Sequence, residues 1–430
     1  MGRDFILGLS SKSKRKKEES LRAIHSLRSG NEFTLTSLAG VESKCLLGKG
    51  GFGEISLVKI AQLPQLCVLK KMLSTADEMV VASCYGEFLI QHRLFMNHRC
   101  FHRIPRPLYV LDCLDADFTG VYGFLMEFCA GGSVSAFAKT WCVDVKDESA
   151  DEGEEDYESS SDSDVFARDF DPLTLNPVKV ASLCVGMIEC LADVFKASRR
   201  LVHRDIKPEN FLVRVNPTDG ECNIVLADLG LANIKESISS SSNSVSFSSV
   251  SSISADPMDS GVLSEAESSP QSYAGTFSYS SFETLKFGES TQLSDAHSLG
   301  MSILALFLCK HPFIGHPLFQ CSQSISSVEY MYIMSELLES DIVEGMLTRS
   351  RLFRSLETIE DGKFKPVHDC LNEVFKGLTR CDVHSRMRVH EACDKIQSIK
   401  ALLPKIGEGW KCPTEEEIIR MKIKQYGKSR

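Results

Sequence analysis

The fold is decided by the stretch His203-Arg204-Asp205-Ile206-Lys207-Pro208-Glu209-Asn210. An Asp in such a stretch can orient an acceptor hydroxyl and take its proton, and a Lys two residues later can neutralise a transferring phosphoryl group. The Asn at its end offers an oxygen ligand of the kind that Mg²⁺ prefers. The stretch therefore predicts phosphoryl-transfer chemistry, with Asp205, Lys207 and Asn210 as the catalytic residues.

A second acid follows at a spacing that suits a shared metal site. Asp228 lies eighteen residues after Asn210, between the strand-like run 224–227 and Leu229-Gly230. A carboxylate at the end of a strand is a suitable oxygen ligand for a bridging metal ion. We expect Asn210 and Asp228 to be the ligands of Mg²⁺.

Upstream, the chain carries a glycine pattern of the type Gly-x-Gly-x-x-Gly. Strands are expected on both sides of it, at residues 44–47 and 55–60, whereas a dinucleotide-binding turn opens a helix. Residues without side chains let backbone N–H groups approach phosphates. The residues expected to contact a nucleotide here are Leu47, Gly48, Lys49, Gly50, Gly51, Phe52, Gly53 and Ile55.

A lysine ends the next apolar run, at residues 67–69, about twenty residues after the glycine pattern. Lys70 is placed to reach phosphates, and Lys71 is the alternative, because strand alternation lets only one of the two face a cleft. Glu87 lies in a helix expected over about residues 77–96. It is either an exposed helix acid or the partner that holds Lys70 in position.

In this order, the glycine pattern, strand lysine, helix glutamate, catalytic stretch and metal-binding acid resemble the eukaryotic protein kinases. The resemblance extends from about Lys44 to about Leu403. It implies an α+β, two-lobed fold, with a small β-rich N-lobe, a larger and mainly helical C-lobe, and ATP between them. It also implies Mg²⁺-dependent transfer of the ATP γ-phosphate to Ser or Thr hydroxyls of protein substrates.

The resemblance assigns roles to the candidate residues. It implies that Asp205 is the catalytic base, that Lys207 contacts the γ-phosphate, and that Lys70 pairs with Glu87. The implied hinge is Glu127-Phe128-Cys129, which would contact adenine through its backbone, with Met126 beside the pocket.

Further matches lie downstream. The resemblance implies that Thr276 hydrogen-bonds the catalytic stretch, as is typical of Ser/Thr kinases. It implies a buried ion pair between Glu283 and Arg386, and it places Asp295 on a buried helix that braces the catalytic stretch.

Four positions depart from the family pattern. Leu229 replaces the usual Phe, Ser281-Phe282-Glu283 replaces Ala-Pro-Glu, and His297 stands where Trp is common. Gln91 stands where an apolar residue normally packs, four residues after Glu87, so it bears on the register of that helix.

Composition divides the chain into a kinase domain, two inserts and two tails. The acidic insert, residues 142–171, contains thirteen acidic residues and only two basic ones, Lys146 and Arg168. The second insert, residues 237–272, is roughly half serine. Both inserts are therefore expected to be disordered. The first tail is basic and expected to be flexible; its run 11–17 is a solvated tail, a nuclear-import signal or a contact to an anionic membrane. The expected segments are 1–35 (basic tail), 36–403 (kinase domain, N-lobe about 36–127 and C-lobe about 130–403), 142–171 and 237–272 (inserts), and 404–430 (C-terminal tail).

The remaining composition narrows the class of protein. The formal net charge of −10 argues against a general nucleic-acid binder. None of the 16 cysteines forms a Cys-x-x-Cys pair, so zinc-ribbon and thioredoxin sites have no support. The longest apolar run, 299–309, is too short to span a bilayer and is expected to be a buried helix. We expect a cytoplasmic or nuclear protein with protein substrates, no nucleic-acid partner and no stable membrane insertion.

The sequence also predicts regulation by phosphorylation, and it leaves two competing functions open. Arg204 beside the catalytic base is typical of kinases activated by a phosphate on the segment 228–283, added by an upstream kinase or by autophosphorylation; the leading positions are Ser268, Ser269 and Ser272. The competing functions are a catalytically weak, kinase-like scaffold and a small-molecule kinase of related fold. The second is disfavoured by Thr276, which belongs to a peptide-docking segment.

Overall fold

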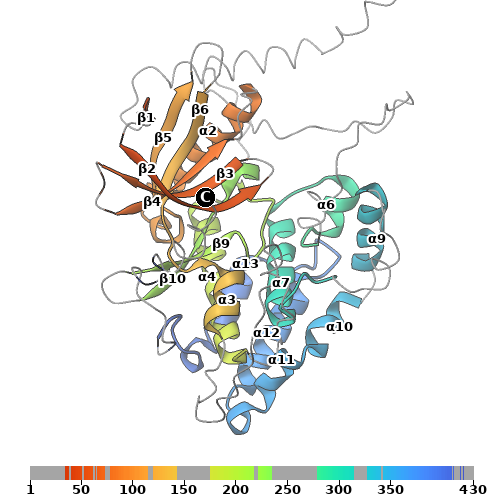
Figure 1. Cartoon of the computed structure of the whole chain (residues 1–430). Helices are drawn as coiled ribbons and strands as arrows, with labels where there is room; N and C mark the ends of the chain where they lie inside the picture. Colours follow the sequence, from red (N-terminus) through yellow and green to blue (C-terminus); the bar gives the residue numbers. More distant parts are fainter. Residues whose placement is uncertain are drawn as a thin grey trace, which may run out of the picture.

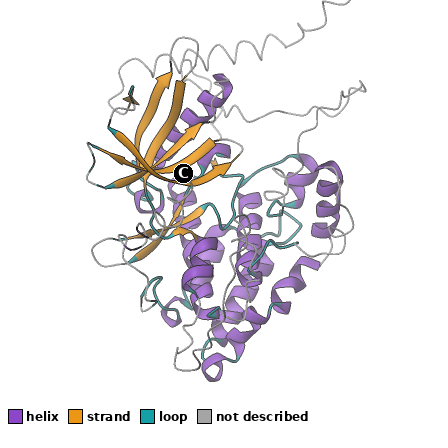
Figure 2. Ribbon diagram, in the orientation of Figure 1, coloured by secondary structure: helices purple, strands orange, loops and turns teal. Residues whose placement is uncertain are grey.

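The computed structural model consists of two lobes, with strands gathered in one and helices in the other (Figures 1 and 2). This arrangement confirms the α+β, two-lobed fold. The structure describes residues 34–37, 40–50, 53–61, 63, 65–72, 78–114, 120–142, 175–216, 221–234, 278–313, 327–339, 342–408, 410, 417 and 420. Within these residues, no helix combines the length and the apolar character that crossing a membrane requires.

The small lobe is a six-stranded sheet of order β1-β5-β6-β4-β3-β2, in which only β1 pairs in parallel. Its strands are β1 (Thr34–Leu35), β2 (Val41–Gly50), β3 (Gly53–Ile60), β4 (Leu66–Met72), β5 (Pro107–Leu114) and β6 (Gly120–Glu127). Helix α2 (Glu78–Phe95) covers one face of this sheet (Figure 1). The rings of Phe88 on α2 and Phe124 on β6 meet edge to face at 6.0 Å, which fixes the face that α2 turns to the sheet.

The large lobe is built around two buried helices, α4 and α7. Its helices are α3 (Val134–Trp141), α4 (Pro177–Ala197), α6 (Phe282–Phe287), α7 (Gln292–Leu308), α9 (Ser327–Glu339), α10 (Ile342–Arg349), α11 (Arg351–Arg354), α12 (Lys365–Leu378) and α13 (Val389–Ile396). Short 3₁₀ turns are η1 (Phe101–Arg103), η3 (Leu229–Leu231), η5 (Ser355–Glu357), η6 (Ile359–Gly362) and η7 (Lys400–Leu402). Short strands are β7 (Gly132–Ser133), β8 (Leu201–Val202), β9 (Phe211–Val215), β10 (Cys222–Leu226) and β11 (Asn233–Ile234).

Local signals in the sequence explain where the two central helices begin. Asn176 caps α4 by accepting hydrogen bonds from the N–H groups of Val178 and Lys179, and Pro177 occupies the first turn, where its missing N–H costs nothing. Helix α7 begins with a capping box between Thr291 and Ser294. Residues 299–307 of the apolar run are buried in α7, as expected, whereas Leu308 and the C-cap residue Cys309 are half-buried.

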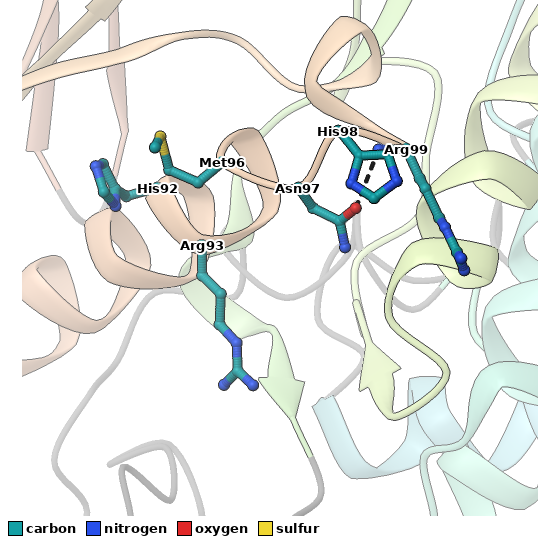
Figure 3. Close-up of a pocket in the computed structure, with 6 residues that line it drawn as sticks. All are labelled: His92, Arg93, Met96, Asn97, His98 and Arg99. Carbon is teal, nitrogen blue, oxygen red and sulfur yellow. Dashed lines mark hydrogen bonds between the residues drawn. The ribbon is translucent and has the colours of Figure 1, made fainter.

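The connection after α2 is anchored on the large lobe. Asn97 donates to the carbonyl of Ala197 at the end of α4 (3.3 Å), and its side-chain oxygen accepts from the N–H of Arg99 (Figure 3). Arg103 donates to Asp193 on α4 at 2.8 Å. These contacts tie the end of α2 to the large lobe, and so they help to set the position of every residue that α2 carries.

The packed part of the chain continues past residue 403. Ser182 on α4 donates to the carbonyl of Pro404 at 3.0 Å, and Trp410 is buried against Phe137 of α3 at 6.0 Å between ring centroids. Described residues on both sides of position 403 therefore pack against the helices of the large lobe.

A buried ion pair joins α6 to the segment before α13. Arg386 donates to both oxygens of Glu283, at 2.6 and 3.0 Å, and its side chain has no exposed surface. Burial raises the pKa of Glu283, but the hydrogen bonds and charge of Arg386 outweigh that effect and lower it to about 2. The expected pair is thus present, and its carboxylate is charged throughout the physiological range of pH.

We predict that Glu283→Gln lowers the free energy of unfolding by about 3–5 kcal/mol at pH 7, because it leaves Arg386 buried without its counter-ion. The folded pKa of Glu283 lies below its ordinary value of 4.5, so the stabilisation is present above about pH 5 and is lost as the pH falls towards 2. Urea unfolding of wild type and Glu283→Gln at pH 7, 5 and 4 measures the difference between their free energies of unfolding. This difference should become smaller as the pH falls to 4.

The matched control is Glu373→Gln, which breaks an ion pair with Lys395 in which the glutamate side chain is 63% exposed. It should change stability by at most about 0.5 kcal/mol. A difference between wild type and Glu283→Gln that is independent of pH would contradict the assignment.

Candidate active site

Asp295 of α7 holds the backbone of the catalytic stretch in place. Both carboxylate oxygens of this buried residue accept backbone hydrogen bonds, from the N–H of His203 (2.7 Å) and of Arg204 (2.8 Å). Arg204 has a φ of 72°, a strained value for a residue with a side chain, and the two bonds to Asp295 stabilise it. The expected brace between Asp295 and the catalytic stretch is therefore confirmed.

Three candidate residues converge within this stretch. Lys207 donates to Asp205 at 2.7 Å, and the side-chain N–H₂ of Asn210 donates to the same carboxylate oxygen at 2.8 Å. Because its nitrogen is engaged by Asp205, the amide of Asn210 keeps its oxygen available as a ligand. Strands β9 and β10 pair with Leu226 opposite Phe211, and this pairing brings Asp228 close to the end of the stretch.

Lys70 joins the two lobes at this point. Its ammonium donates to both oxygens of Glu87 on α2 and to Asp228 after β10, all at 2.8 Å. Burial alone lowers the pKa of Lys70, but Glu87 and Asp228 outweigh it and raise the pKa, so the side chain stays charged. Burial raises the pKa of Glu87, and Lys70 opposes that rise. Lys70, and not the alternative Lys71, is the residue that meets these two acids.

Asp228 is held in a conformation that few residues adopt. Its φ of 57° and ψ of 66° lie in the left-handed region, at a cost of about 1–3 kcal/mol. Burial raises its pKa and Lys70 lowers it, and the net effect is a lowered pKa. The side chain remains 48% exposed, so an ionised oxygen is accessible from the cleft. Together with the amide oxygen of Asn210, this carboxylate makes a set of hard oxygen donors that fits Mg²⁺.

Two glycines of the glycine pattern have different surroundings in the structure. A side chain on Gly48 would meet no atom within 4 Å, so this position faces open space. A side chain on Gly53 would lie 2.2 Å from the carbonyl oxygen of Lys71, so strand packing alone requires glycine there. Lys49 pairs with Glu54 at 3.1 Å, whereas Gly51 and Phe52 lie outside the described residues. Leu47 and Ile55 pack against the core from the two strands.

The hinge is anchored through the side chain of Glu127. Arg214 on β9 donates to its two oxygens at 2.6 and 2.8 Å, and the N–H of Arg106 donates to one of them at 2.8 Å. The N–H of Glu127 donates to the carbonyl of Arg106, so a contact from this residue to adenine is left to its carbonyl. Cys129 is buried, and its carbonyl accepts from the N–H of Gly132.

Comparison with known proteins agrees with this geometry. The family model for the protein kinase domain matches residues 41–395. The chain belongs to the protein kinase family. It is also similar to mitogen-activated protein kinase kinase 1 of Arabidopsis thaliana, with 23% identity over 278 residues. That alignment covers 64% of this chain and 57% of the relative, so the chain spans little more than half the length of this relative.

The kinase departs from its family pattern without losing the packing at the affected positions. Leu229 is buried at 1% exposure, so Leu fills the position of the usual Phe. His297 is also buried, and burial lowers its pKa to about 3, which keeps it neutral inside α7.

Gln91 is the departure with the clearest structural consequence. It is buried at 1% exposure and donates to the carbonyl of Pro105 at 2.9 Å, next to the sulfur of Met126. A buried amide with a partner is tolerated, and here it links α2 to the start of β5. Since Glu87 still meets Lys70, the polar residue leaves the register of α2 in this kinase intact.

The sequence did not indicate one feature of the site. Arg214 holds the hinge and also donates to the carbonyls of His102 and Ile104 at 2.8 Å. In the sequence it is one outward-facing residue of an alternating strand, which carries no signal of its distant partners. Thr276, which was expected to contact the catalytic stretch, lies outside the described residues.

We predict that Gln91→Leu destabilises the kinase by about 1–3 kcal/mol, because it leaves the buried carbonyl of Pro105 without a donor. Urea unfolding measures the change. Gln397→Leu is the control, since Gln397 makes the same kind of bond to the carbonyl of Cys393 (3.0 Å) on the exposed surface. Equal stability of wild type and Gln91→Leu would refute the role of this hydrogen bond.

Proposed function

We propose that the chain is an active, Mg²⁺-dependent serine/threonine kinase that transfers the γ-phosphate of ATP to protein substrates. One observation carries the proposal: Lys70 contacts Glu87 and Asp228 at the same time. This contact supports the proposal because it joins a positive charge to a candidate metal ligand, and the segment that leads to this ligand is hydrogen-bonded to the end of the catalytic stretch. Phosphoryl transfer depends mainly on such positioning and charge neutralisation.

Each residue has a defined task in this proposal. Asp205 orients the acceptor hydroxyl and takes its proton, and Lys207 neutralises charge on the transferring group. Lys70 binds the α- and β-phosphates, while Asn210 and Asp228 hold Mg²⁺. When bound, the metal would offset the negative charge of the phosphates.

The remaining residues hold the nucleotide. The glycine pattern covers the phosphates, and Glu127 and Cys129 of the hinge contact adenine through their backbone. Two observations support activity rather than a scaffold role. No residue with an assigned task in ATP binding, metal binding or proton transfer is replaced, and the ion pair between Lys70 and Glu87 is formed.

We predict that Asp205→Ala lowers kcat about 10²–10⁴-fold with little change in the KM for ATP, because the proton acceptor is lost while the nucleotide contacts remain. Lys70→Met should lower kcat/KM for ATP at least about 10²-fold. Transfer of labelled γ-phosphate to a generic protein substrate with Mg-ATP, and its loss on chelation of Mg²⁺, are the measurements.

Lys71→Met is the matched control, because Lys71 follows Lys70 on β4, whereas it is Lys70 that contacts Glu87 and Asp228. It should keep activity within about threefold. Wild-type protein that binds Mg-ATP but transfers no phosphate to any protein would favour the scaffold function.

Regulation by phosphorylation is also part of the proposal. The Nε atom of Arg204 is buried and has no hydrogen-bond partner among the described residues. A buried guanidinium nitrogen without a partner is costly, and a phosphate can supply both the charge and the acceptor. The segment between residues 235 and 277, outside the described part of the chain, carries the serines proposed to be modified.

We predict that replacement of Ser268, Ser269 and Ser272 together by Ala reduces activity at least about tenfold, because Arg204 then lacks its phosphate partner. Phosphatase treatment should lower wild-type activity to the same level and leave the triple variant unchanged. The control replaces Ser159, Ser160 and Ser161, which lie in the acidic insert. Unchanged activity, with no phosphate found on residues 264–276 by mass spectrometry, would disprove the site.

A further inference from the structure

A hollow of about 110 Å³ opens in the large lobe, directly beside the catalytic stretch. Three parts of the lobe enclose it: α3, the residues after Lys207, and the end of α7. Its volume is enough for one side chain of medium size, since a cavity of about 150 Å³ holds a benzene molecule. The lining residues used below are Lys139, Leu175, Glu209, Tyr279, Lys310 and His311.

The hollow lies next to the place where the acceptor hydroxyl must sit. Glu209 is two residues from Lys207 and four from Asp205 on the same loop. Tyr279 is buried and lines the hollow: burial raises the pKa of its hydroxyl, and the nearby charges of Glu209 and Asp205 raise it further. A peptide that presents a hydroxyl to Asp205 therefore passes its neighbouring residues over this hollow.

Two lysines give the rim its charge. Lys139 on α3 and Lys310 after α7 are both exposed, and neither forms an ion pair with a described residue. Lys139 is near enough to Cys309, another lining residue, to lower its pKa, while burial raises that pKa to about 11. Glu209 supplies the opposing charge. Two lysine charges against one glutamate charge leave the described lining of the hollow with a net positive charge.

The interior adds a further unpaired group. The Nδ1 atom of His311 is buried without a hydrogen-bond partner among the described residues, and its ring lies 5.5 Å from that of Tyr279. The apolar surface between these groups comes from residues such as Ala138, Leu175 and Leu306. A ligand with an aliphatic stem and a negatively charged end matches this combination of surfaces.

We propose that this hollow is a substrate subsite that accepts an acidic side chain close to the phosphorylated residue, which makes the protein an acid-directed kinase. The proposal rests on the proposed function, because it names the class of substrate that the same site takes. The carboxylate of a substrate Glu or Asp lies between Lys139 and Lys310, and its stem covers the apolar floor.

The acidic insert of the chain itself has the same chemistry as the proposed substrate side chain. Residues 143–174, which lie outside the described residues, include most of the acidic insert; they leave after Cys142, and Leu175 at their end lines the hollow. The N–H of Asn176 donates to the carbonyl of Cys142 at 2.6 Å, so the two ends of this segment meet there. The experiment must therefore separate substrate recognition from neutralisation of the chain's own acids.

The test uses peptides with one Ser acceptor and either Glu, Ala or Lys at each flanking position in turn. For wild type we expect kcat/KM with Glu to exceed that with Lys by about tenfold at one or more positions, because two exposed ion pairs contribute up to about fivefold each. Lys139→Glu/Lys310→Glu should reverse this preference, and Lys139→Gln/Lys310→Gln should abolish it. Raising NaCl from 0.05 to 0.5 M should weaken it.

The matched control is Lys196→Glu/Lys405→Glu, which makes the same change in net charge at exposed lysines outside the hollow. It should keep the wild-type preference. The proposal is wrong if wild type does not distinguish Glu from Lys, or if charge reversal at Lys139 and Lys310 leaves the preference unchanged. It is also wrong if deletion of residues 144–171 abolishes the dependence on the two lysines, since they would then serve the chain's own segment.

A binding measurement separates this proposal from the proposed function. Fluorescence anisotropy reports the affinity of a labelled Glu-containing peptide without any phosphate transfer. Binding that depends on Lys139 and Lys310, without transfer to any peptide, would support the subsite and refute the kinase activity. Transfer without dependence on the two lysines would support the activity and refute the subsite.

Discussion

The candidate active site of this kinase depends on one ammonium group held by two carboxylates from different lobes. Lys70 lies at the end of a strand of the small lobe, Glu87 is on α2, and Asp228 follows β10 of the large lobe, with all three contacts at 2.8 Å. A charge with so little exposure is stable only when it is paired, so each partner must be positioned accurately. The orientation of β4, the register of α2 and the strained backbone of Asp228 are all consequences of this requirement.

The rest of the molecule supplies that accuracy through buried polar contacts. Asp295 accepts a hydrogen bond from the backbone of the catalytic stretch, Arg386 donates to Glu283, and Gln91 donates to the carbonyl of Pro105. Polar groups in a core are stabilising only when their partners are present, and at these positions they are. Helix α7 concentrates several of these contacts because it is buried along its length and still carries polar side chains.

Unsatisfied groups are informative against this background. Arg204 beside the catalytic base and His311 in the hollow each keep a buried nitrogen without a described partner. We propose a phosphate as the missing partner in the first case and a substrate in the second. For the same reason we propose that Lys139 and Lys310, which line the hollow, influence the choice of substrate.

Sequence alone indicated the family, because each of its motifs is a short local pattern and the motifs follow one another in the family's order. The order from the glycine pattern to Asp228 predicts the two-lobed kinase fold, and short runs of strand-forming residues indicate strands of the small lobe. Alternation could not choose between Lys70 and Lys71, since it says which residues share a face and not which face meets α2.

Only the tertiary structure decided the contacts between distant segments. It shows that strand packing requires glycine at position 53. It also shows that Arg214 contacts Glu127, which lies 87 positions earlier in the chain, and that Lys139 and Lys310 line one hollow. In the sequence, Gly53 belongs to the glycine pattern and Glu127 to the implied hinge, and neither indicates the contact that the structure shows. Arg214, Lys139 and Lys310 look like ordinary surface residues. Their partners depend on strand register and on how helices dock, which are properties of the whole packed chain and not of any local pattern.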